Sequence, residues 1–213
     1  MNVTKQVLAR RRTVVQSCLR LALYIFLVVG LVAVGYAGYI IADAQTYQAI
    51  QLRKFAHDVR IVEPHLPGIG EPVGEIEIPR LALKAIILQG DSSQVLRRGV
   101  GHLPRTPMPG EWGNVGLAGH RDSFFRSLRH IRPGDMITLH TLKGQFQYRV
   151  ESTRVVSPAN IEVLAATDKR ELTLVTCFPF NYVGAAPHRF VVRALQVPAS
   201  DHLEQEADVR PKF

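Results

Sequence analysis

Residues 137–150 read Ile-Thr-Leu-His-Thr-Leu-Lys-Gly-Gln-Phe-Gln-Tyr-Arg-Val, and they carry the clearest indication of the fold class. Apolar and polar side chains alternate on both sides of Lys143-Gly144, with the two-residue period of a strand that has one buried face. Lys143-Gly144 is a turn candidate, because glycine adopts the backbone conformations that tight turns require. The segment therefore predicts two strands joined by a turn.

Similar patterns recur on both sides of this segment. The other candidate strands cover residues 75–78, 84–88, 154–156, 172–176 and 189–195. Seven or eight short strands between Gly- and Pro-containing turns predict a mainly β domain with a closed or nearly closed sheet. Helical candidates are few and short, at residues 92–97, 123–129 and 161–166.

The net charge of +8 raises the question of nucleic-acid binding. Residues 1–42 hold five of the 26 Lys and Arg residues and no Asp or Glu, so the remaining 21 Lys and Arg against 18 Asp and Glu leave only +3 for the rest of the chain. The arginines of that part form no continuous basic stripe with interleaved aromatic side chains. The sequence therefore predicts no nucleic-acid partner.

Residues 21–42 form an uncharged apolar run of 22 residues, directly after the basic residues 1–20. A helix of this length spans about 33 Å, enough for the hydrocarbon core of a bilayer. We therefore expect a single-pass anchor in the cytoplasmic membrane, with a cytoplasmic N-terminus and the rest of the chain outside. A signal peptide cleaved after Ala44 is the alternative, although the run exceeds the roughly 7–15 residues of a signal peptide's apolar region.

A stretch rich in proline and glycine divides the rest of the chain. Residues 63–72 contain three prolines and two glycines, which break any helix. We expect an extracytoplasmic linker over residues 43–72, the β domain over 73–197 and a polar C-terminal tail over 198–213.

The two cysteines are too few for a disulfide framework and lack the paired spacing of a zinc site. Cys177 follows a buried-strand pattern and precedes Phe178-Pro179, which ends the strand where a substrate can reach it. A lone cysteine is often a small core residue. In the predicted topology Cys18 lies across the membrane and cannot pair with Cys177. Outside the cytoplasm a free thiol is a liability, so the presence of Cys177 as a free thiol favours a functional role.

A thiol nucleophile needs a base or a neighbouring cation, and usually a donor for the oxyanion. His120 ends an apolar run with small residues, and His102 lies in a similar setting, so spacing alone does not choose between them. Arg189 opens the strand that follows Cys177 and is well placed if the two strands are neighbours. A hydrogen-bonded structural histidine and a solvated arginine remain open as alternatives.

Three motifs together resemble the sortase family of cysteine transpeptidases: Leu117-Ala-Gly-His120, Thr173-Leu-Val-Thr-Cys177 and Arg189. The resemblance covers residues 73–197, and Phe178 to Arg189 is particularly similar to class D sortases. It implies a closed sortase-type β-barrel of about eight strands with a few short helices.

The resemblance also implies roles for individual residues. Cys177 would attack the Thr carbonyl of an LPxTG- or LPxTA-like sorting motif and form a thioacyl-enzyme. His120 would act as general acid and base, and Arg189 would stabilise the oxyanion. Thr176 matches a position that helps to bind the substrate. The implied partners are secreted proteins with a C-terminal sorting motif and an amine from peptidoglycan or a lysine.

The sequence indicates no cofactor. Some sortases bind calcium, but the chain has no dense Asp/Glu cluster to support that ion. Two other functions are alternatives. A cell-wall L,D-transpeptidase would also use a cysteine, although the residues around Cys177 do not match its usual motif. A non-catalytic envelope module could keep the same barrel for binding.

Overall fold

The computed structural model describes residues 20, 23–39, 42, 46, 48, 50 and 67–198. Residues 23–39 are helical. In the described part of the chain, no helix combines the length and the apolarity that crossing a membrane requires. Residues 1–19, the ends of the predicted anchor, most of the predicted linker and the tail from residue 199 lie outside the described residues.

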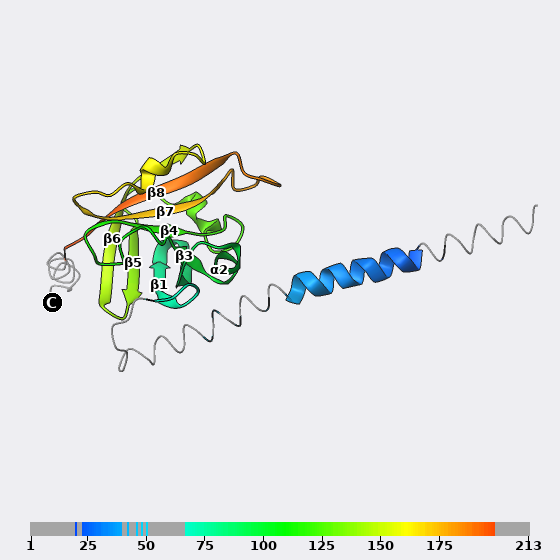
Figure 1. Ribbon diagram of the computed structural model, residues 1–213. Helices are drawn as coiled ribbons and strands as arrows, with labels where there is room; N and C mark the ends of the chain where they lie inside the picture. The colour runs from blue at the N-terminus through cyan, green and yellow to red at the C-terminus, as the bar shows by residue number, and fades with distance from the viewer. Residues whose placement is uncertain are drawn as a thin grey trace, which may run out of the picture. The chain divides into compact units, whose positions relative to one another are not determined.

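Eight strands close into a barrel in the order β1-β2-β3-β4-β7-β8-β6-β5 (Figure 1). This confirms the predicted mainly β class and the closed barrel. The strands are β1 (Pro72–Ile78), β2 (Leu83–Gln89), β3 (Val100–His102), β4 (Gly113–Ala118), β5 (Met136–Thr141), β6 (Gly144–Val156), β7 (Arg170–Phe178) and β8 (His188–Gln196).

The strand pattern differs from the prediction in β3, β4 and β6. β3 has only three residues, and β4 is almost wholly buried, so neither shows the alternation that marks a strand with one solvent face. β6 is one strand of 13 residues where two segments were predicted. Its pairing with β8 shifts register between Val150 and Ser152, and such a bulge interrupts the two-residue period.

The helical elements are short, as predicted. α2 (Ser93–Arg98) is capped by Ser92, whose hydroxyl accepts a hydrogen bond from the Val95 amide at 3.3 Å. The other two predicted segments form single turns of 3-10 helix rather than α-helices. The 3-10 turns are η1 (Pro79–Leu81), η2 (Arg126–His130) and η3 (Ile161–Leu164).

The barrel interior fixes which side chains face outward on β7 and β8. Leu172 and Leu174 of β7 and Val192 of β8 are fully buried in the main hydrophobic cluster. Because side chains alternate along a strand, residues 173, 175 and 177 of β7 point to the outer face, as do 189, 191 and 193 of β8. These outer positions carry the candidate site.

An ion pair joins η1 to the segment that precedes β5. Asp135, with only 7% of its side chain exposed, accepts hydrogen bonds from the Arg80 guanidinium and from the Arg132 amide. The Arg80 hydrogen bonds hold the pKa of the Asp135 carboxyl below its usual range. The folded state therefore gains stability from this carboxylate above its unfolded pKa and loses it as the pH falls through the folded pKa.

We expect Asp135→Asn to lower the free energy of unfolding by about 1 kcal/mol at pH 7, since Arg80 is partly exposed to solvent. The loss should shrink as the pH falls below about 4, because the carboxyl of the unfolded chain then takes up a proton while the folded carboxyl, with its lowered pKa, is protonated only at lower pH. Urea unfolding at pH 7 and pH 3.5 measures both effects. Asp168→Asn, in an exposed turn, is the control, and an equal loss for Asp135→Asn at both pH values would contradict the argument.

Candidate active site

The register between β7 and β8 places Cys177 directly opposite Arg189. Both side chains belong to the outer face, and Cβ atoms of such cross-strand pairs lie about 4.5–5.5 Å apart. Cys177 is a free thiol and is partly exposed. The condition on which the placement of Arg189 depended, that the two strands are neighbours, is met, and the two residues come together at one end of the barrel.

His120 follows β4, the other neighbour of β7. β4 and β7 run parallel, with Ala118 paired to Val175, and the Gly119 amide donates to the Val175 carbonyl at 3.2 Å. His120 and Cys177 each lie two residues after this pair, His120 just beyond the end of β4 and Cys177 within β7. The strands β4, β7 and β8 lie side by side (Figure 1). Their pairing thus brings His120, Cys177 and Arg189 to the same end of the sheet.

The backbone that carries His120 is held from two sides. The buried Thr176 hydroxyl donates to the Gly119 carbonyl at 2.7 Å, and the Phe125 amide donates to the His120 carbonyl at 3.0 Å. A side chain at Gly119 would place its Cβ 2.7 Å from the fully buried Phe125 ring, so only glycine fits there. The direct substrate contact that the sequence suggests for Thr176 stays a prediction.

Arg189 keeps donors for a ligand. Its Nη1 donates to the carbonyls of Ala186 and His188, at 3.3 and 3.0 Å. Nε and Nη2 make no hydrogen bond to any of the described residues, so both can donate to a ligand. A guanidinium anchored by one nitrogen and open at the others suits a developing oxyanion.

His102, the second candidate base, lies inside the structure. It is 1% exposed, its Nδ1 lies 2.8 Å from Gln89 Oε1, and its Nε2 lies 2.9 Å from the Pro107 carbonyl oxygen. Burial lowers the pKa of its imidazole, which favours the neutral form. With both ring nitrogens engaged, His102 has the geometry of a structural histidine.

Comparison with known proteins identifies the family. The family model of the sortase domain matches residues 76–197. The chain belongs to the sortase family. The predicted family is thus confirmed, and with it the prediction that the protein is a cysteine transpeptidase.

Relatives cover most of this sortase. Sortase D of Bacillus subtilis (strain 168) is 31% identical over 185 residues, which are 79% of this chain and 93% of that protein. A solved Sortase D5 transpeptidase of Clostridium perfringens superimposes with a TM-score of 0.65 at 28% identity, over 72% of this chain and 99% of that chain. The crystal structure of sortase C1 of Streptococcus agalactiae superimposes with a TM-score of 0.56 at 33% identity, over 60% of this chain and 68% of that chain.

Arg121, directly after His120, ties the site to the β7–β8 loop. Its Nη2 donates to the carbonyls of Tyr182 and Gly184, at 2.6 and 3.0 Å, and its guanidinium lies 5.8 Å from the centre of the Tyr182 ring. Its place in the sequence predicts no role for it. Its partners lie 61 and 63 residues away, so only the adjacency to His120 could have drawn attention to it.

Among the described residues, Glu75, Glu77 and His140 could together offer ligand atoms to a metal ion, within 4.8 Å of one another. They lie on β1 and β5, away from β7 and β8 in the strand order. Glu75 already pairs with Lys84 at 2.8 Å, and His140 Nε2 lies 3.4 Å from Glu77. Internal partners thus occupy these groups.

Proposed function

We propose that this sortase cleaves an LPxTG- or LPxTA-like sorting motif after its Thr and transfers the acyl group to an amine, with Cys177, His120 and Arg189 as the catalytic residues. The observation that supports this most directly is the alignment of three neighbouring strands, which carry a free thiol, an imidazole and a guanidinium to one end of the sheet. Nucleophilic acyl transfer requires these three kinds of group.

In the first half-reaction, the Cys177 thiolate attacks the Thr carbonyl carbon and forms a tetrahedral oxyanion. Arg189 donates hydrogen bonds to that oxyanion through Nε and Nη2. When the intermediate collapses, the C–N bond breaks and His120 protonates the departing amine. The product is a thioester between the substrate's Thr and Cys177.

In the second half-reaction, an amine replaces the C-terminal fragment. His120 accepts the proton of the incoming amine as its nitrogen attacks the thioester carbonyl, and Cys177 leaves as thiolate. The acceptor is an amine of peptidoglycan or a lysine, and the acyl donor is a secreted protein with a C-terminal sorting motif. The new amide attaches that protein to the cell envelope.

We also propose that residues 21–42 anchor the enzyme in the cytoplasmic membrane, with the catalytic domain, residues 73–197, on the outer side. The support is the uncharged run of 22 residues after the basic N-terminus. This topology places Cys177 beside translocated proteins while they are still near the membrane.

The test uses the full chain in detergent micelles, with peptides that contain LPxTG or LPxTA and with several amines. Mass spectrometry should detect cleavage after Thr and an amide between the Thr carboxyl group and the added amine. Absence of both products from a folded enzyme would overturn the proposed function. Cleavage at another residue would overturn the proposed motif and leave the transpeptidase reaction standing.

Arg189→Lys is expected to lower kcat by about 100-fold and Arg189→Ala by about 1,000-fold, because the oxyanion loses donors in fixed geometry. Cleavage of a fluorogenic sorting peptide measures the rate. Arg126→Lys, on the exposed 3-10 turn η2, is the matched control and should retain full activity. Equal kcat for Arg189→Lys and the wild type would contradict the assignment.

A further inference from the structure

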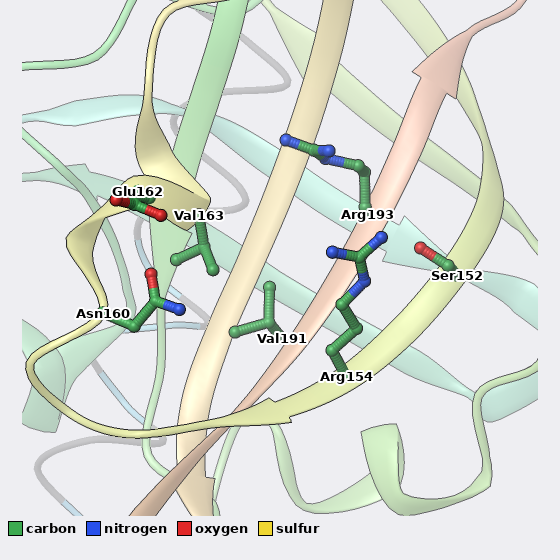
Figure 2. Close-up of a pocket in the computed structure, with 7 residues that line it drawn as sticks. All are labelled: Ser152, Arg154, Asn160, Glu162, Val163, Val191 and Arg193. Carbon is green, nitrogen blue, oxygen red and sulfur yellow. The ribbon is translucent and has the colours of Figure 1, made fainter.

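A cavity of about 200 Å³ lies on the outer face of β6 and β8, where η3 and the β6–β7 loop close over it (Figure 2). Its walls consist of Ser152, Arg154, Asn160, Glu162, Val163, Val191 and Arg193. Sites for small-molecule ligands usually measure roughly 300–1,000 Å³. This cavity therefore has the size for one or two side chains of a longer ligand.

The cavity lies on the same face of the sheet as Cys177. Val191, on its floor, pairs with Val175 of β7 and with Arg154 of β6. Val175 is two residues before Cys177, and two residues of a strand span about 7 Å. An extended peptide with its scissile carbonyl at Cys177 can therefore place a side chain in the cavity from a position about two to four residues away.

Positive charge dominates the strand side of this cavity. Arg154 is exposed and makes no ion pair or hydrogen bond within the described residues. Arg193 has 34% of its side chain exposed, and its Nε lies 3.5 Å from Glu171 Oε2. Figure 2 shows both guanidinium groups on the strand side, with Glu162 across Val163 on the loop side. Arg154 thus has no ion-pair partner among the described residues.

We propose that this cavity is a subsite for an acidic side chain, Asp or Glu, of the sorting peptide, about two to four residues from the scissile bond. The inference rests on the proposed function, which brings the peptide to Cys177. The carboxylate would accept paired hydrogen bonds from Arg154. Ser152 and Asn160 offer further donors, and Val191 would contact the methylene groups.

The test compares pairs of peptides that differ only by Glu or Gln, at each position within four residues of the scissile Thr. With the full chain, at least one Glu peptide should have about tenfold higher kcat/KM than its Gln partner, mainly through KM. The ratio should decrease as salt is raised. In Arg154→Gln the ratio should fall to about one.

Arg149→Gln is the matched control, since it removes one exposed positive charge from β6 outside the cavity. It should keep the wild-type ratio. Arg154→Glu should reverse the preference and favour a Lys peptide. Cleavage of neutral peptides without any Glu preference, or with a preference that survives Arg154→Gln, would overturn the subsite and leave the proposed function standing. Failure to cleave any peptide would overturn both.

Discussion

Cys177→Ala is expected to abolish both cleavage of a sorting peptide and transfer to an amine, with a loss of at least about 10⁴-fold. Without the thiol no thioester forms, and the remaining groups can only assist direct attack by water or by the amine. Intact-protein mass spectrometry measures this directly. The wild type should accumulate a species heavier by the acyl fragment when amine is withheld, and the Ala variant should show none.

Cys18→Ala is the control for this substitution, because it removes the other cysteine of the chain. It should retain wild-type turnover and still form the acylated species. A Cys177→Ala variant that turned over at the wild-type rate would refute the nucleophile assignment. Loss of activity in both variants would point instead to a requirement for both thiols, which the mechanism does not contain.

The fold could be predicted from segments where one strand face meets solvent. The amino-acid types of residues 137–150 alternate clearly, because the apolar side chains Ile137, Leu139, Tyr148 and Val150 lie in the buried core and polar side chains stand between them. β4 escaped prediction since it is buried and pairs in parallel with β7, so its side chains show no two-residue period. Periodicity therefore identified the barrel but not the strand that leads to His120.

The site depended on information that local sequence does not contain. The proximity of Cys177 and Arg189 could be inferred only on the assumption that consecutive strands pair, and the register of β7 with β8 confirmed it. The contact of Arg121 with the β7–β8 loop depends on long-range packing, and so does the cavity that Arg154 and Arg193 both line. No spacing rule brings such residues together.

The choice between His120 and His102 could not be made from spacing, and a paired experiment tests it. His120→Gln is expected to lower kcat by about 10²–10⁴-fold, the usual loss when a general acid and base is removed. Its thermal stability should change little, because His120 is only partly buried. Rates per folded enzyme and unfolding curves measure the two effects separately.

His102→Gln should show the opposite pattern. Its ring is buried and hydrogen-bonded to Gln89 and Pro107, so substitution should lower the free energy of unfolding by about 1–3 kcal/mol while the folded fraction keeps its kcat. Burial lowers the His102 pKa from 6.5, so the wild type should lose stability as the pH falls below about 6.5, and the variant should lose less. If His102→Gln removed kcat and His120→Gln removed only stability, the two roles would have to be exchanged.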